Sequence, residues 1–138
     1  MPITYTIDSV TSTIETRLAG SLNVQEVREH FERLADDPAT PDRLWVVINA
    51  TELGTIPTVA MIEMTRRMAE FTRSRVRFEA VAVAAGSPAH YGMFRMGQVL
   101  LESVFGATLV TRDLAEAREW LAQQRESRGG ARRSRRPV

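Results

Sequence analysis

The sequence predicts one α/β domain with a mixed, mainly parallel sheet of five strands packed by about four helices. Three observations favour this class. The chain begins with two segments that alternate apolar and polar residues, two later strand-length runs are apolar at both parities, and amphipathic helical patterns separate the later strands. Strands that alternate with helices require right-handed crossovers and therefore parallel neighbours, whereas an initial hairpin adds one antiparallel strand. The expected order is β-β-α-β-α-β-α-β-α.

The first 20 residues are expected to form a β-hairpin. ITYTID (3–8) and TSTIETRLAG (11–20) alternate apolar and polar residues, which is the period of a half-buried strand. NVQEVREHFERLADD (23–37) then predicts a helix, because its Asn23-x-x-Glu pattern is that of a capping box. Its apolar residues recur on one face, as in an amphipathic surface helix. We expect His30 of this helix to lie beside its charged face.

Two later runs are predicted to be interior strands. LWVVIN (44–49) and the second half of RFEAVAVAAG (77–86) are apolar on both faces, as in a strand that lies centrally in the sheet or is covered on both sides. Between them, IPTVAMIEMTRRMAEFTRS (56–74) predicts a helix with Pro57 in its first turn. Thioether side chains adapt to irregular gaps, so we expect an inward stripe that fills the core. This stripe consists of Met61, Met64, Met68 and Phe71.

A third helix is predicted to begin at Ser87, which can cap it, and Pro88 suits its first turn. Gly106 is expected to end it. A strand, ATLVT (107–111), and a helix that opens with capping-box spacing, DLAEAREWL (113–121), complete the order. The expected inward stripe of the third helix consists of Met93, Met96, Leu100, Leu101 and Val104.

The composition is that of an ordinary globular protein, with 43% hydrophobic and 25% charged residues among 138. The absence of cysteine excludes disulfides, thiolate metal sites and cysteine nucleophiles. No apolar run approaches the ~20 residues of a membrane-spanning helix, and the first residues lack the basic and apolar regions of a signal peptide. We therefore expect a cytoplasmic protein without a cofactor.

The charge of the chain is unevenly distributed. Residues 125–138, RESRGGARRSRRPV, hold six arginines and one glutamate, although the whole chain has a net charge of only +1. Residues 1–124 are therefore mildly acidic. The basic segment has no apolar periodicity, and its glycines and proline favour disorder. We expect a domain over 1–124 and a disordered arginine-rich tail over 125–138, which is either simply solvated or in weak contact with anions, without specific nucleic-acid recognition.

Three segments carry a resemblance to a known family: LWVVINATEL (44–53), TRDLAEAREWL (111–121) and the pattern Tyr91-Gly92-Met93-x-Arg95-Met96. Together with the order of elements, they resemble the SpoIIAA-like branch of STAS-type domains, which are distantly related in fold to CRAL-TRIO lipid-binding modules. The resemblance covers residues 3 to about 122. It implies a bacterial, non-enzymatic module that binds a protein partner or a small apolar or amphipathic ligand, and it is compatible with a homodimer.

The resemblance also implies a modification site. In the antagonist proteins of this family, a phosphorylatable serine lies in a D-S-x-G element that opens the helix after the third strand. This sequence has Pro57 at the aspartate, Thr58 at the serine and Ala60 at the glycine. Thr58 is therefore a candidate for a phospho-switch of the anti-sigma-factor-antagonist type, since a helix start tolerates a phosphate. The alternative is that Thr58 only supports the helix start.

The segment after the second interior strand supplies candidate ligand-binding residues. Gly92 permits close approach of the backbone to a neighbour or a small ligand. The helix dipole does not favour Arg95 near a helix start, so a specific bond is expected, either to Asp113 or Glu63 or to an anionic head group. Methionines from two helices would line an adaptable pocket. The candidate ligand-binding residues are Tyr91, Gly92, Arg95, Met61, Met64 and Met93.

Catalytic motifs are missing from the sequence, which contains no G-x-S-x-G, G-x-G-x-x-G or P-loop pattern. Two histidines do not make a histidine-rich metal site, and Asp36, Asp37 and Asp42 are expected in a solvated loop. One catalytic alternative remains, a small hydrolase that uses Ser87 and His90, because helix starts after such strands line the ligand crevice of α/β folds. We nevertheless expect His90 to be an exposed first-turn residue and the chain to be non-enzymatic.

Overall fold

The computed structural model describes residues 2–134, and the side chains of residues 2–127. This part of the chain forms a five-stranded sheet in the order β1-β2-β3-β4-β5, in which β1 and β2 are antiparallel and each later pair is parallel. The predicted α/β class and mixed, mainly parallel sheet are confirmed. The strands are β1 (Ile3–Asp8), β2 (Thr13–Gly20), β3 (Arg43–Leu53), β4 (Arg77–Ala85) and β5 (Ala107–Thr111).

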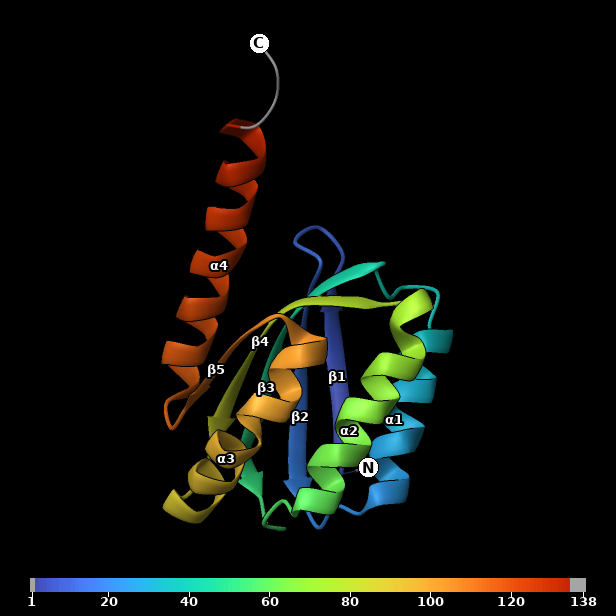
Figure 1. Cartoon of the computed structure of the whole chain (residues 1–138), viewed down its shortest axis with the longest axis vertical. Coiled ribbons are helices and arrows are strands. Elements are labelled where there is room, and N and C mark those ends of the chain that lie inside the picture. The colour runs from blue at the N-terminus through green and yellow to red at the C-terminus, as the bar shows by residue number, and fades with distance from the viewer. Residues whose placement is uncertain (1, 135–138) are drawn as a thin grey trace.

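The helices lie in two layers on opposite faces of the sheet (Figure 1). The sheet grows in one direction along the chain, so the right-handed crossovers place α1, α2 and α3 on the same face. Helix α4 follows the last strand and is not a crossover, so it is free to cover the other face. Among the described residues, the helices are α1 (Val24–Asp36), α2 (Val59–Phe71), the 3-10 helix η1 (Thr72–Ser74), α3 (Pro88–Phe105) and α4 (Leu114–Ser134).

The predicted starts of α1 and α3 are confirmed. The Glu26 backbone N–H donates to Asn23 Oδ1 at 2.9 Å, and the Asn23 backbone N–H donates to Glu26 Oε1 at 3.1 Å, which completes a capping box. Ser87 caps α3, and Pro88 is its first residue. At the end of α3, Gly106 has a φ of 71°, a conformation that favours glycine.

Helix α2 begins two residues after Pro57, which was predicted to lie in its first turn. Thr58 is the capping residue, because its Oγ1 accepts the backbone N–H of Met61 at 3.2 Å. Pro57 therefore precedes the helix and does not lie in its first turn. Of the predicted stripe, Met61 and Met68 are buried, whereas Phe71 is 81% exposed. The stripe fills the core as expected, but it ends where α2 changes into η1.

The inward face of α3 is rotated relative to the predicted stripe. Met96 is 60% exposed and Leu100 is also exposed, so only Leu101 of that stripe is fully buried. The rotation follows from the packing of Gly97 against α2, since a Cβ at Gly97 would lie 2.6 Å from Ile62 Cδ1. The buried residues of α3 are His90, Phe94, Gly97, Leu101 and Phe105.

Helix α4 is longer than the sequence suggested. It continues to Ser134 and projects beyond the sheet (Figure 1), so the domain boundary predicted at residue 124 falls inside a helix. Residues 125–134, for which disorder was predicted, continue as helix, and the arginine, glutamate and alanine residues among them favour a helix. Residues 135–138 of the predicted tail lie outside the described residues.

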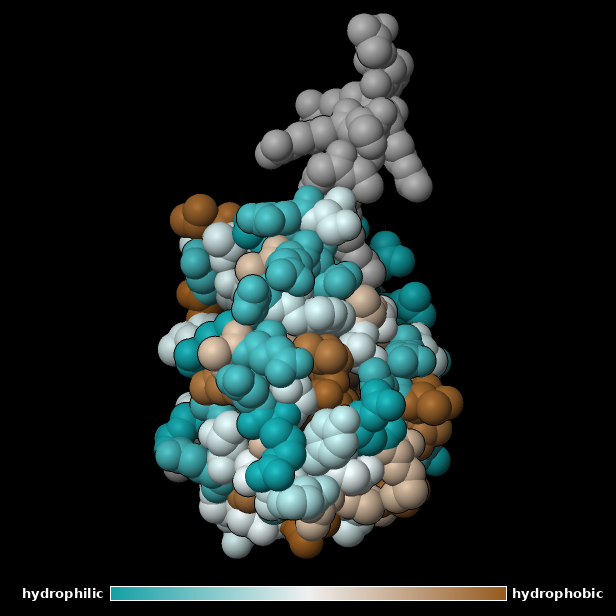
Figure 2. Space-filling view, turned by 90° about the vertical axis from the view of Figure 1, so that its left-hand side faces the viewer, coloured by the Kyte–Doolittle hydropathy of each residue, from teal (hydrophilic) through white to brown (hydrophobic). Residues whose placement is uncertain are grey.

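The two faces of the sheet carry different side chains. On the α4 side, alanines of β4 pack against α4 together with Trp45 and Val47 of β3. On the other side, valine, isoleucine, leucine, methionine and phenylalanine side chains fill the space below α1, α2 and α3. The outer surface near α4 is mostly hydrophilic, with separate apolar patches (Figure 2). The larger core, and any space within it, therefore lies under the three-helix layer.

Candidate functional site

A cavity of about 110 Å³, which we call the core cavity, lies between the sheet and the layer of α1, α2 and α3. Its wall is mainly apolar. Every strand and each of the three helices contributes to it, with residues that include Ile3, Ile14, Val46, Val81, Val110, Phe31, Met61 and Phe94. The core cavity is the main candidate ligand site of the described chain, because such sites are concave and apolar with a few polar groups.

Two of the polar side chains in this wall are already satisfied. Thr65 Oγ1 donates to the Met61 carbonyl oxygen at 2.9 Å. Gln98 Nε2 donates to the carbonyl oxygen of Thr108 at 3.1 Å and to its Oγ1 at 3.0 Å. The Thr65 hydroxyl proton and the Gln98 amide N–H groups are therefore already used, and neither is free to donate to a ligand.

His30 is the exception in the wall of the core cavity. It is only 9% exposed, and its Nδ1 is buried without a hydrogen-bond partner among the described residues. Burial, and secondly the charge of Arg33, lower the pKa of His30 from 6.5 to about 4. The ring is therefore neutral at pH 7, with one nitrogen that donates and one that accepts. Edge contacts to the rings of Tyr5 and Phe31, at centroid distances of 5.7 and 5.6 Å, hold it in place.

The position of His30 corrects the expectation that it lies beside the charged face of its helix. Its neighbours at helical spacing, Val27 and Leu34, are buried, and so is Phe31. Residues three and four apart share one face of a helix, so the sequence already held the signal for a buried histidine. The prediction was wrong because it followed the charged residues next to His30 in the sequence and not the spacing of the apolar ones.

The loop after α1 is held by Tyr5 rather than by a cation. The Tyr5 hydroxyl donates to Asp37 Oδ2 at 2.8 Å. Burial, and then this hydrogen bond, raise the pKa of Tyr5 to about 12. The backbone N–H of Ala39, and then the Tyr5 hydroxyl, lower the pKa of Asp37. No group of three histidine, aspartate or glutamate side chains in the described range is placed to hold a metal ion.

The predicted ligand-binding residues are not gathered around one cavity. Met61 lines the core cavity. Met64 and Tyr91 are partly buried and pack against the core, and Met93 is partly buried on α3. Gly92 is exposed, and a Cβ at this position would meet no atom within 4 Å, so the expected close approach is not made there. The structure therefore places one of these candidates in the wall of the core cavity.

Arg95 makes neither of the ion pairs that the sequence suggested. Its Nη1 donates to Gln98 Oε1 at 2.6 Å on the exposed side of α3. Glu63 is held by two arginines of its own helix, at 2.7 and 3.3 Å. Asp113 accepts two backbone N–H groups at the start of α4, as its spacing predicted. Both acidic groups are therefore engaged elsewhere, and the expected ion pair of Arg95 is wrong.

Thr58 is exposed at the start of α2, where its hydroxyl oxygen accepts the Met61 backbone N–H. This is the supporting role that the sequence left open beside phosphorylation. Exposure keeps the hydroxyl accessible to a modifying enzyme. The cap also connects Thr58 directly to Met61, a residue of the core-cavity wall.

Ser87 and His90 are brought into contact. Ser87 Oγ lies 2.5 Å from His90 Nδ1, and His90 Nε2 lies 3.1 Å from the Thr55 carbonyl oxygen. Because a carbonyl oxygen only accepts, Nε2 carries the proton and Nδ1 accepts the Ser87 hydroxyl. His90 is 8% exposed, so the expectation of an exposed first-turn residue is wrong. Its ring is buried because it joins the start of α3 to the loop before α2.

The contact between Ser87 and His90 has the hydrogen-bonding order of a nucleophile and its base, but it stands apart from the core cavity. Neither residue lines that cavity, and neither does Thr55. Ser87 Oγ also accepts the His90 backbone N–H at 3.2 Å, which is the bond of a helix cap. The geometry is that of a fixed helix start, and hydrolysis would require a substrate cavity beside Ser87.

Within residues 2–134, none of the helices has the length and apolar character needed to cross a membrane. No family model, no curated protein and no solved structure matches the chain.

Proposed function

We propose that the chain is a non-enzymatic binding module of the STAS type, whose core cavity holds a small amphipathic molecule. The observation that carries the proposal is the neutral ring of His30, whose buried Nδ1 has no partner among the described residues and which lines a mainly apolar cavity. The order of elements supports the STAS-type assignment. The position of Ser87 and His90 outside the core cavity supports binding over catalysis.

The size of the core cavity limits the ligand. An apolar protein cavity of about 150 Å³ binds benzene. The core cavity of about 110 Å³ therefore suits one small ring or a chain of a few carbon atoms. Each buried methylene of such a ligand contributes about 0.8 kcal/mol.

His30 sets the polar end of the ligand. A buried nitrogen without a hydrogen-bond partner costs roughly 1–3 kcal/mol. A hydroxyl group both donates and accepts, so it satisfies Nδ1 in either tautomer of the neutral ring. We therefore expect a small alcohol or phenol to bind more tightly than a hydrocarbon of the same shape.

Phenol and benzene are matched probes for this proposal, because they share one ring and differ by one hydroxyl. We expect phenol to bind about tenfold more tightly than benzene, and His30→Leu to remove this difference. Calorimetric titration measures both affinities. Arg95→Ala is the control, since Arg95 is exposed and bonds only to Gln98 among the described residues. Equal affinity of the unaltered chain for both probes, or binding of neither, would contradict the proposal.

A phospho-switch at Thr58 is a second candidate function, favoured by its exposed hydroxyl at the cap of α2. A phosphate there adds about −1.5 to −2 charges beside the free N–H groups of the first turn, where the helix dipole favours negative charge. The Met61 N–H would exchange one acceptor for another, so the change would reach the core-cavity wall. Phosphate mapping on protein from its own cells tests this function. An unmodified Thr58 under all growth conditions would exclude it.

A further inference from the structure

A second hollow, of about 290 Å³, lies where β3 and β4 begin, at the opposite end of β4 from Ser87. Three arginines line it: Arg43, Arg73 and Arg77. We call it the arginine hollow. Arg73 and Arg77 are close in the sequence, in RSRVR (73–77), whereas Arg43 lies 30 residues before Arg73. The sequence alone assigns no role to these arginines, because they belong to no known motif.

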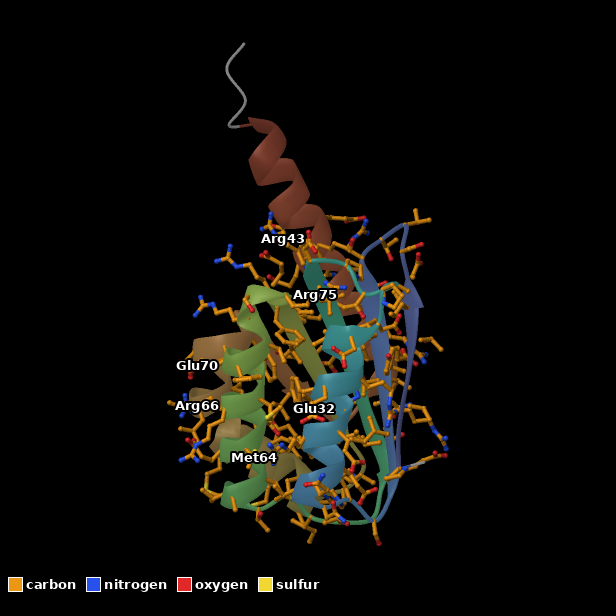
Figure 3. All side chains as sticks on the ribbon, turned by 90° about the vertical axis from the view of Figure 1, so that its right-hand side faces the viewer. Glu32, Arg43, Met64, Arg66, Glu70 and Arg75 are labelled. Carbon is orange, nitrogen blue, oxygen red and sulfur yellow. The ribbon has the colours of Figure 1, made fainter. Side chains whose placement is uncertain are left out.

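The arginines converge because of the sheet register. Arg43 and Arg77 begin neighbouring parallel strands and are register partners, and Arg73 lies in η1 just before β4. The backbone N–H of Arg77 donates to the Asp42 carbonyl oxygen at 2.7 Å. Arg75 Nη2 donates to two carbonyl oxygens of the loop before β3, at 3.1 and 2.8 Å. Arg43 and Arg75 lie at this same end of the molecule (Figure 3). The hydrogen bonds connect the loop before β3 to the segment from Arg75 to the start of β4.

The charges that line the arginine hollow do not balance. Arg43 Nε is paired with Glu79 Oε1 at 2.5 Å. The guanidinium groups of Arg73 and Arg77 make no ion pair or hydrogen bond with another residue of the described range. Glu102, the other carboxylate in the wall, accepts the Thr108 hydroxyl at 3.4 Å. The guanidinium groups of Arg73 and Arg77 thus face a polar space in which Glu102 is the one wall carboxylate outside an ion pair.

We propose that the arginine hollow binds an oxyanion, a phosphate or carboxylate group, through Arg73 and Arg77. A guanidinium group presents two parallel N–H donors that match the oxygens of either group. The volume admits the anion together with bridging water molecules. This site goes beyond the proposed function, because it does not require the core cavity to be occupied.

The charge of the wall favours the same ligand. Three arginines and two carboxylates line the arginine hollow, so the wall carries a net positive charge. Such a charge raises the local concentration of anions, and salt screens this attraction.

Phe78 connects the two hollows, because it lines both the core cavity and the arginine hollow. Its ring packs edge-on against Phe105 and Phe31, at centroid distances of 4.9 and 6.3 Å. The oxyanion therefore has two possible sources. It is either a free anion, or the head group of a short amphiphile whose apolar part passes Phe78 into the core cavity.

Titration with inorganic phosphate at low ionic strength, followed by amide NMR, tests the site. We expect saturable shifts at the start of β3, at η1 and at the start of β4. Arg73→Gln and Arg77→Gln should each weaken binding about tenfold, because each removes charged hydrogen bonds. Arg95→Gln is the matched control and should leave binding unchanged. An amide spectrum that is unchanged away from the substituted arginine shows in each variant that the fold is intact.

Butanoate and butan-1-ol distinguish the source of the anion. Weaker butanoate binding in Arg73→Gln, with unchanged butanol binding and displacement by phenol, supports the head group of an amphiphile. Phosphate binding that depends on the two arginines supports a free anion. The proposal is overturned when neither phosphate nor butanoate affinity responds to either arginine substitution. That result leaves the phenol test of the core cavity unaffected, so the two proposals fail separately.

Discussion

The two faces of β4 are packed in opposite ways. On one face, Ala82 and Ala84 are fully buried against α4, where Ala117 is fully buried as well. On the other face, Val81 and Val83 of the same strand line the core cavity below the three-helix layer. Small side chains let one helix approach the sheet closely, whereas large side chains from three helices leave a space between them. Tight packing and ligand space are thus divided between the faces of one sheet.

His30 gives the largest expected effect, because it is a titratable group buried on the loosely packed face. Its pKa is about 4 in the folded protein, whereas a histidine free of such interactions, as in the unfolded chain, has a pKa of 6.5. Between these values the unfolded chain binds a proton and the folded protein does not. The stability contributed by the neutral ring is complete above pH 6.5 and falls by about 1.4 kcal/mol per pH unit towards pH 4, a loss of about 3 kcal/mol.

Urea unfolding at pH 7, 6, 5 and 4.5 measures this loss. We expect His30→Leu to flatten the dependence between pH 6.5 and 4.5, because leucine does not titrate. Arg95→Ala should keep the slope of the unaltered chain. An identical slope in His30→Leu and the unaltered chain would show that His30 is not buried as described.

A pair of neighbouring substitutions in β4 compares the packing of the two faces. Ala82→Val adds two carbon atoms where Ala82 is fully buried against the α4 side, and we expect a loss of about 1–3 kcal/mol in the free energy of unfolding. Val83→Ile adds one carbon atom towards the core cavity, and we expect a gain of about 0.5 kcal/mol together with weaker benzene binding. Urea unfolding and calorimetry measure the two effects. Equal losses at both positions would remove the contrast between the faces.

Ser87 is expected to matter for stability and not for catalysis. Ser87→Ala removes the cap of α3, which costs about 1 kcal/mol. A serine-directed acylating probe should leave Ser87 unlabelled, because neither Ser87 nor His90 lines the core cavity. Mass spectrometry after probe treatment decides this point. A label at Ser87 that disappears in Ser87→Ala would support the hydrolase instead.

The smallest expected effect concerns the ion pair that joins α4 to the sheet. Arg118 Nε and Nη2 donate to the two oxygens of Glu15 at 2.7 and 2.9 Å, and the Arg118 and Glu15 side chains are 54% and 35% exposed. Exposed pairs contribute about 0.2–1 kcal/mol, so Arg118→Gln should reduce stability by no more than this. The difference should shrink in 1 M salt, where the Debye length is about 3 Å. A larger loss that salt leaves unchanged would show that α4 depends on this pair rather than on its alanine packing.

Period and capping patterns predicted most of the fold. The alternation of the first strands, the two apolar runs and the Asn23 and Ser87 caps are local signals, and each is confirmed. The rotation of α3 was not predictable in the same way. It depends on Gly97, whose missing side chain admits Ile62 from another helix, and periodicity cannot weigh a contact between helices.

The candidate site was predicted less well, for two physical reasons. The core cavity is a space left by side chains from five strands and three helices, and no single segment encodes it. His30 was within reach of the sequence, because its spacing from Val27 and Leu34 matches the buried face of α1. Arg73 and Arg77 are close in the sequence, but Arg43 joins them only through the strand register, which the sequence does not state.

A crystal structure of the protein with bound phenol tests the claim that the core cavity holds a ligand at His30. We expect phenol density in the core cavity, with the hydroxyl within hydrogen-bond distance of His30 Nδ1 and the ring against Phe31 and Met61. Phenol bound elsewhere, or a His30 Nδ1 already bonded to another protein atom with the cavity closed around it, would contradict the claim.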